Sequence, residues 1–294
     1  MFTTTRPVRR RLAAATGVLT LLALASGCGS DDQPSSAVGD VAVAHVHGLG
    51  INPADDALIV ATHNGAFRIA PDAGEARPIG QDRQDTMGFT VAGADHFLGS
   101  GHPDAAGRAA GQPALLGLIE STDAGATWTP ISLSGEVDFH ALAARHEQVY
   151  GWDSGTSRFM VSTDGIEWEV RSTVAIFDFA VDPGDADHII ASGPDGLLES
   201  FDGGTTWDTI DGPLLVTLSW DESAGLWGVA PDGGTHHLET SGWVSGGTLP
   251  GQPQALLATA DSLYAAAFDD EERTGIYRST NDGETWDLYY RDDS

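Results

Sequence analysis

From about residue 40 onward, the chain alternates between short apolar segments and turns rich in Gly, Asp, Asn and Pro. The segments 47–51 and 177–181, for example, have the length of a typical β-strand. Each ends in a dipeptide that favours a turn, Asn52-Pro53 or Asp182-Pro183. A second apolar segment follows each of these turns. The pattern predicts an all-β protein made of many short strands, and the high content of Gly (37) and Trp (8) agrees with this.

A motif that begins with Ser and ends with Trp repeats along the chain. It occurs at four places and in degenerate form at two more: 121–128, 162–168, 200–207, 279–286, and from residues 70 and 240. Successive copies begin 51, 41, 38, 40 and 39 residues apart, which is the spacing of four-stranded propeller blades. Six units fit between residues 41 and 291, so we predict a six-bladed β-propeller and find no room for a seventh blade. We expect the ring to close through 41–43 or through packing between blade faces alone.

The motif resembles the Asp-box, also called the BNR repeat, and the resemblance covers nearly the whole chain after residue 40. It implies that short Ser and Asp side chains bond to backbone donors of a turn, while the Trp packs between neighbouring blades. The residues in these structural roles are Asp123, Trp128, Asp164, Trp168, Asp202, Trp207, Asp282 and Trp286. Calcium binding by these aspartates is the alternative, but they lack a second cluster of oxygen ligands. Asp-box proteins include sialidases, other glycoside hydrolases and non-enzymatic propellers, so the resemblance leaves the function open.

The first 40 residues have the features of an export signal and a tether. A cationic stretch, Arg6 to Arg11, precedes an apolar run of 13 residues, too short to span a bilayer as a helix. The run leads into Leu24-Ala25-Ser26-Gly27-Cys28, which resembles a bacterial lipobox and contains the only Cys of the chain. We therefore predict a lipoprotein signal peptide at 1–27, a lipidated Cys28 and flexible tether at 28–40, and a single propeller domain at 41–291. The alternative is a plain secretory signal with an incidental Cys. The resemblance implies an exported protein held on the outer face of the bacterial cell membrane by its lipid anchor alone.

The charge of the chain limits the classes of molecule that it can bind. All 14 basic residues are Arg, and the formal net charge is −29. Four of these Arg precede residue 28, so the remainder has ten Arg against 43 acidic residues, a balance of −33. Such a field repels nucleic acid and attracts cations. The 41% hydrophobic content is enough to form a core, which excludes acidic disorder.

The arginines do not match the pattern of a sialidase, which needs three inward Arg side chains. In the repeat alignment, Arg68, Arg158 and Arg278 fall on third strands, while Arg145 and Arg171 fall in turns or on outer strands. A glycosidase that uses only carboxylates remains an alternative. Its candidate catalytic residues are Asp85, Glu136 and Asp138.

Residues that can bind metals gather at equivalent positions of the first three units. These positions are the start of the first strand and the end of the second strand, which surround the channel on one face of a propeller. They hold His45, His47, His63, Met87, His102, His140 and Asp153, together with Asp85 and Asp138. Residues two apart on a strand point the same way, so such side chains converge. His with Met suits copper and His with Asp suits zinc, whereas the alternative is that each His only caps a strand or bonds a carboxylate.

These observations favour a monomeric binding module that captures copper or zinc, or a ligand through the metal, at this face. The ligand is then an unknown small molecule, glycan or protein. A glycoside hydrolase and a non-catalytic assembly or adhesion scaffold are the rival functions. The second unit is the longest, and we expect its extra loop, between His102 and Leu116, to overhang the same face.

Overall fold

The computed structural model is a six-bladed β-propeller, and it describes residues 43–71 and 74–291. These residues form 24 strands in six four-stranded antiparallel sheets and one helix of five residues. The fold predicted from the repeat is therefore confirmed. The predicted signal peptide, Cys28 and the tether lie outside the described residues. No helix in the described part of the chain is long and apolar enough to span a bilayer.

The first three blades are formed by the strands up to residue 173. Blade 1 contains β1 (Val46–Asn52), β2 (Ala57–Thr62), β3 (Gly65–Ile69) and β4 (Ala76–Pro78). Blade 2 contains β5 (Asp85–Gly93), β6 (His96–His102), β7 (Leu118–Ser121) and β8 (Thr129–Ser132), with α1 (Ala105–Ala109) between β6 and β7. Blade 3 contains β9 (Phe139–Arg145), β10 (Gln148–Asp153), β11 (Arg158–Ser162) and β12 (Glu169–Thr173).

The remaining strands form three blades of the same design. Blade 4 contains β13 (Asp178–Val181), β14 (Ile189–Gly193), β15 (Gly196–Ser200) and β16 (Asp208–Ile210). Blade 5 contains β17 (Thr217–Asp221), β18 (Gly225–Val229), β19 (Gly234–Glu239) and β20 (Gly242–Thr248). Blade 6 contains β21 (Gln252–Thr259), β22 (Ser262–Phe268), β23 (Thr274–Ser279) and β24 (Asp287–Arg291).

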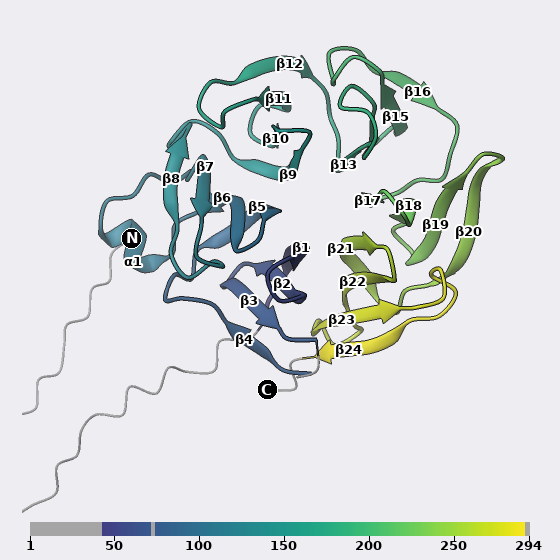
Figure 1. The fold of residues 1–294 in the computed structure, drawn as a ribbon, viewed down its shortest axis with the longest axis horizontal. Coiled ribbons are helices and arrows are strands. Elements are labelled where there is room, and N and C mark those ends of the chain that lie inside the picture. The colour runs from purple at the N-terminus through teal and green to yellow at the C-terminus, as the bar shows by residue number, and fades with distance from the viewer. Residues whose placement is uncertain (1–42, 72–73, 292–294) are drawn as a thin grey trace, which may run out of the picture. The chain divides into compact units, whose positions relative to one another are not determined.

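Each sheet pairs its four strands in chain order, with the first strand innermost and the fourth at the outer edge (Figure 1). The second strands are almost wholly buried, because both of their faces are covered by neighbouring blades. The buried hydrophobic residues form six clusters, and each cluster lies mainly along one junction between adjacent blades. The core is therefore a ring of interfaces rather than a single centre.

The ring closes by packing between blades 1 and 6, without a shared strand. Phe67 and Ile69 of blade 1 lie in one buried cluster with Ala266 and Ile276 of blade 6. Val43, which we expected to take part in closure, is buried in the same cluster. Two hydrogen bonds also cross this seam, from Val46 N to Gln254 Oε1 at 2.7 Å and from Thr274 Oγ1 to Ala44 O at 3.2 Å.

The Ser-to-Trp motif forms the turn between the third and fourth strands. In its copy at 200–207, the buried Ser200 hydroxyl accepts a hydrogen bond from Gly204 N at 2.9 Å, and Asp202 Oδ1 accepts one from Thr206 N at 2.8 Å. Trp207 Nε1 donates to Ser172 Oγ on the preceding blade at 3.0 Å. The turn thus fixes both its own backbone and the adjacent blade.

The other full copies keep the bonds of the Ser and Asp side chains, with one exception in residue type. Trp168 Nε1 also donates to Ser132 Oγ, at 3.0 Å, whereas Trp286 Nε1 has no hydrogen-bond partner among the described residues. The Ser hydroxyls of these copies accept from Gly125 N, Gly165 N and Gly283 N. In the last copy, the side chain that accepts from Thr285 N is Asn281. Asp282, which we assigned to this role, follows it in the left-handed region with φ of 55°.

Replacing Ser200 with Ala is expected to lower the free energy of unfolding by about 1–3 kcal/mol, because it leaves the buried Gly204 N–H without its acceptor. Urea unfolding of the full chain measures this change. Ser223→Ala, in an exposed turn, is the matched control and is expected to change stability by less than about 0.5 kcal/mol. Equal effects of the two substitutions would contradict the structural role of the turn.

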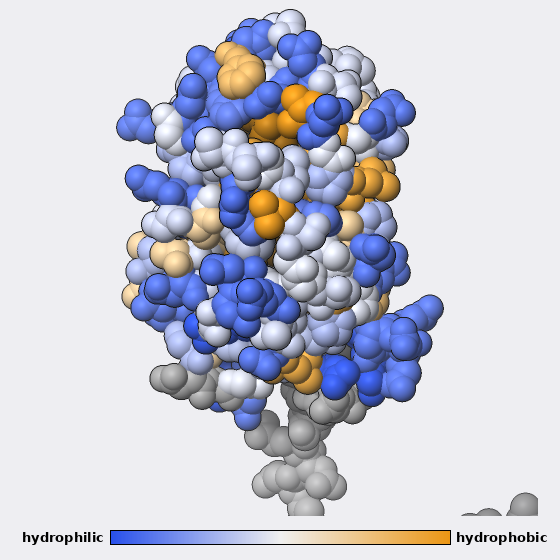
Figure 2. Space-filling view, turned by 90° about the vertical axis from the view of Figure 1, so that its right-hand side faces the viewer, coloured by the Kyte–Doolittle hydropathy of each residue, from blue (hydrophilic) through white to orange (hydrophobic). Residues whose placement is uncertain are grey.

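The outer surface does not present a broad hydrophobic face on the side that carries blade 5. Figure 2 shows this side as mostly hydrophilic, with small separate hydrophobic patches.

The extra loop of blade 2 does not lie where we expected it. Its helix α1 lies at the outer edge of the ring and not over the central opening (Figure 1). Asp104 caps this helix through Gly107 N and also accepts from Arg83 N, which holds the loop to the connection that enters blade 2.

Candidate metal site

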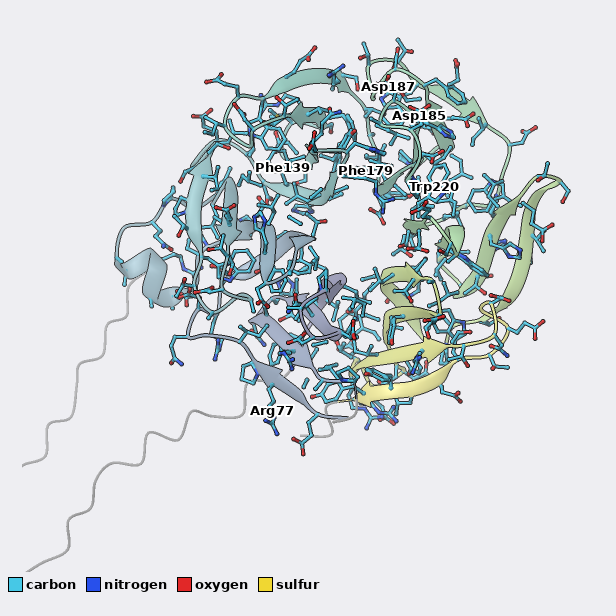
Figure 3. The ribbon with its side chains drawn as sticks, in the orientation of Figure 1. Arg77, Phe139, Phe179, Asp185, Asp187 and Trp220 are labelled. Carbon is cyan, nitrogen blue, oxygen red and sulfur yellow. The ribbon has the colours of Figure 1, made fainter. Side chains whose placement is uncertain are left out.

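The inner strands surround a channel of about 650 Å³ that is lined by all six blades. The labelled Phe179 and Trp220 lie on inner strands beside the central opening, whereas Arg77 lies at the outer edge (Figure 3). His45, His47, Met87 and His140 line the channel. The predicted convergence of the first three blades on the channel therefore holds for these residues.

Three imidazole rings of blade 1 lie together at the channel mouth. His45 and His47 flank Val46 at the start of β1, and His63 lies in the turn between β2 and β3. A bulge between Val46 and Gly48 shifts the register there. Ring centroids are 4.6 Å apart for His45 and His47, 5.2 Å for His45 and His63, and 4.6 Å for His47 and His63. One ligand nitrogen from each ring falls within 4.8 Å of the other two, a spacing that suits one metal ion.

Asp85 of blade 2 adds a carboxylate to these rings. Its Oδ1 lies 2.7 Å from Nδ1 of His63 and 3.3 Å from Nε2 of His47. Burial by itself raises the pKa of this carboxyl, but His47 and His63 together lower it below its ordinary value. Asp85 is therefore a carboxylate at neutral pH and can act as a fourth ligand.

The histidines are held in the form that binds metals. Burial, together with the neighbouring His47 and His63, lowers the pKa of His45 to about 4. Burial also lowers the pKa of His47, which Asp85 offsets only in part. Both rings are consequently neutral at pH 7 and keep a lone pair for a ligand bond.

A second group forms around Asp138 at the same mouth. Its Oδ2 lies 2.9 Å from Nε2 of His140 and 3.6 Å from Nε2 of His102, and it accepts a hydrogen bond from Ser154 Oγ at 3.2 Å. Burial raises the pKa of Asp138, but His140, His102 and Ser154 together lower it below its ordinary value. The sequence predicted one set of metal ligands, and the structure divides them between Asp85 and Asp138.

Two predicted residues do not contribute a side chain to either group. Asp153 is buried at the end of β10, where its carboxylate accepts from Asp138 N at 3.1 Å and pairs with Arg158 at 3.0 Å. A register shift between Trp152 and Asp153 accompanies this arrangement. Glu136 is exposed in the turn before β9 and does not line the channel.

The arginines are placed largely as expected. Arg68, Arg158 and Arg278 lie on the third strands β3, β11 and β23, and Arg171 lies on the outer strand β12. Our placement of Arg145 in a turn or on an outer strand was wrong. It is the last residue of the inner strand β9, lines the channel, and donates from Nη2 to Trp220 O at 3.0 Å.

The blades without ionisable residues at the aligned positions contribute features that the sequence did not indicate. Phe177 and Val216 line the channel from blades 4 and 5, and Phe177 is 47% exposed. Asp178 also lines it, with a carboxyl group that accepts from Phe179 N and Leu218 N, each at 2.8 Å. Burial raises the pKa of Asp178 to about 7. The sequence shows only an Asp next to a Phe at this position.

Comparison with known proteins establishes the fold and no closer relationship. No protein-family model and no curated protein sequence matches the chain. A GH74 xyloglucanase from Xanthomonas campestris is similar in structure, with a TM-score of 0.55 and 17% identity over 84% of this chain and 45% of that chain. This chain thus spans less than half of the xyloglucanase.

Two further structures share the propeller over most of their own length. A chain from the nidogen–laminin complex has a TM-score of 0.60 at 14% identity, over 80% of this chain and 93% of that chain. A gluconolactonase from Xanthomonas campestris has a TM-score of 0.59 at 12% identity, over 77% and 84%. At such identities the likeness concerns the fold, and function has to be argued from the site.

Proposed function

We propose that this protein is a metal-binding propeller module that holds one zinc or copper ion with His45, His47, His63 and Asp85. The observation that carries the proposal is the approach of three ligand nitrogens to within 4.8 Å of one another, with a carboxylate oxygen 2.7 Å from one of the rings. Neutral imidazoles and a carboxylate offer lone pairs, so a cluster of this kind is suited to binding a cation. The acidic chain, with a net charge of −29, raises the local concentration of cations.

Three histidines and one carboxylate form a donor set typical of zinc. Met87 lines the same channel, and a thioether together with imidazoles favours copper. The proposal therefore covers both ions, and a competition experiment between them decides which is preferred.

The wider role that fits this site is an exported module. The lipobox resemblance supports anchoring through Cys28 to the outer face of the bacterial cell membrane, and the Asp-box resemblance supports a secreted propeller. The partner is then a small molecule, glycan or protein that reaches the metal at the channel mouth, with the protein acting as a monomer.

The carboxylates offer less support for a glycoside hydrolase, although such enzymes are among the structural neighbours. A glycosidase needs one carboxyl group that stays protonated to act as the acid. The pKa values of the predicted catalytic residues Asp85 and Asp138 both lie below the ordinary range, so neither has this property. The pKa of Asp178 is raised to about 7, but both of its oxygens already accept hydrogen bonds from backbone N–H groups. Glu136 does not line the channel.

Metal titration of the purified full chain tests the proposal. Calorimetry with zinc and with copper is expected to show one ion per chain at micromolar affinity or tighter. His47→Ala removes a ligand whose side chain is only 8% exposed. It is expected to weaken binding by more than about 100-fold, since loss of a residue that merely supports a ligand already costs 10–100-fold.

His96→Ala is the matched control for this experiment. His96 also pairs with a carboxylate, at 2.8 Å from Glu120, but it starts β6, at the end of blade 2 opposite His102. The control is expected to bind as tightly as the unmodified protein. The absence of one-to-one binding in the unmodified chain, or equal affinity in His47→Ala, would refute the proposed function.

A further inference from the structure

The group around Asp138 has a geometry that the metal site does not use. Asp138 directs Oδ2 at Nε2 of His140, 2.9 Å away, and Ser154 holds the same oxygen. Only 12% of the Asp138 side chain is exposed, and its Oδ1 is buried without a hydrogen-bond partner among the described residues. A buried carboxylate behind an imidazole orients the ring and stabilises its protonated form.

This group is better suited to moving a proton than to holding a second metal. In the described residues, the ligand atoms of Asp138, His102 and His140 do not all come within the 4.8 Å that His45, His47 and His63 achieve. The ring of His102 is held in place by a hydrogen bond that its Nδ1 donates to Ala114 O, at 2.9 Å. His140 keeps Nδ1 without a hydrogen bond to the described residues.

His140 faces the same space as the metal site. Both His140 and His47 line the channel, and Met87 occupies the equivalent position on the blade between them. A small ligand in this channel therefore has both side chains along its wall.

The channel also limits the kind of molecule that it admits. The net charge of −29 disfavours anionic molecules such as phosphate esters. Phe177 and Val216 provide an apolar wall on the half of the channel that lacks histidines. The volume of about 650 Å³ suits a small molecule. These properties describe a small uncharged compound with one apolar group and one polar group.

We propose that the channel mouth hydrolyses small uncharged carboxylic esters, with His140 as general base and Asp138 as its positioning residue, an inference that rests on the proposed metal site. His140 Nδ1 takes a proton from water while the water oxygen forms a bond to the carbonyl carbon. The bond from that carbon to the alcohol oxygen then breaks, and the departing oxygen takes the proton from His140. The products are the carboxylic acid and the alcohol, and the base is regenerated. A zinc ion held by His45, His47, His63 and Asp85 would supply positive charge for the oxygen atoms of this reaction.

Hydrolysis of 4-nitrophenyl acetate by the full chain, with and without zinc, tests this inference. The zinc-loaded protein is expected to show saturable turnover that the zinc-free protein lacks. His140→Gln is expected to lower kcat by at least about 100-fold, the contribution of a general base. Asp138→Asn is expected to lower kcat while KM is unchanged, and His96→Ala is expected to retain full activity.

Zinc content, measured in the same samples, separates the two proposals. Loss of turnover in His140→Gln with one zinc still bound supports the role of His140. Zinc-loaded protein that hydrolyses the ester no faster than zinc-free protein refutes the activity but leaves metal binding intact. Full activity in His140→Gln at equal zinc content refutes the assignment of the base. A chain that takes up neither zinc nor copper refutes the proposed function, and a chain that takes up no zinc refutes this inference.

Discussion

Replacing Phe67 with Ala is expected to lower the free energy of unfolding by about 3–5 kcal/mol, the usual cost of deleting a buried aromatic ring. Phe67 is 1% exposed and lies in the cluster that joins blades 1 and 6. No strand is shared across this seam, so hydrophobic packing and the few hydrogen bonds that cross it hold the ring closed. A cavity at this place therefore weakens closure directly.

Phe159→Ala is the matched substitution at an interface between consecutive blades. Phe159 is fully buried between blades 3 and 4, where the chain is continuous. Equal losses in urea unfolding for both substitutions are expected if the seam is packed as well as an internal interface. Phe201→Ala, at a residue that is 67% exposed, is the control and is expected to cost less than about 1 kcal/mol. A loss for Phe67→Ala as small as that of the control would show that the seam is open in solution.

Asp178→Asn is expected to stabilise the protein at pH 8 and to have a much smaller effect at pH 5. Burial raises the pKa of this carboxyl to about 7 in the folded state, against about 3.9 in an unfolded chain. The folded state therefore binds the proton more tightly, and stability is lost as pH rises from about 4 through 7. The uncharged Asn avoids this loss and keeps an oxygen that can accept from Leu218 N or Phe179 N.

The gain from Asp178→Asn is expected to grow by about 3 kcal/mol between pH 5 and pH 8, since each unit of pKa difference corresponds to 1.36 kcal/mol. Urea unfolding of both proteins at the two pH values measures it. Asp208→Asn, on the exposed outer strand β16, is the control for a general effect of charge, and its effect is expected to be equal at both pH values. A stabilisation by Asp178→Asn that does not change with pH would contradict the raised pKa of Asp178 in the folded state.

The repeat made the fold predictable. Copies of the Ser-to-Trp motif mark the same turn in successive sheets, so their spacing counted the blades. The internal order of apolar segments also placed most strands. Arg145 was misplaced because β9 extends to Arg145, whereas β13 ends earlier, at Val181. The end of an inner strand depends on its pairing with the second strand, which the repeat does not encode.

For the candidate site, the sequence predicted only which equivalent positions of the repeat hold metal-binding residues. Equivalent positions brought His45, His47 and His63 to one mouth, as the alternation of side chains requires. The division of the ligands between Asp85 and Asp138 depends on how each side chain turns, and the sequence does not determine this. Asp153 illustrates the limit, because its carboxylate bonds to Asp138 N and Arg158. Asp178 was not predicted, since its raised pKa depends on its position against Leu218 of blade 5.

The closure of the ring has a consequence for how this chain can be rearranged. Every sheet is built from four consecutive strands, so a cut at any connection between blades leaves all six sheets whole. Ala44 contacts Thr274, and Arg291 pairs with Gly275, so both ends of the described ring meet at the start of β23. Circular permutation with a short linker therefore conserves the architecture. Single blades can therefore be exchanged between propellers. Replacing blades 4 to 6 with blades of other propellers alters none of the proposed metal ligands, because all of these lie in blades 1 and 2.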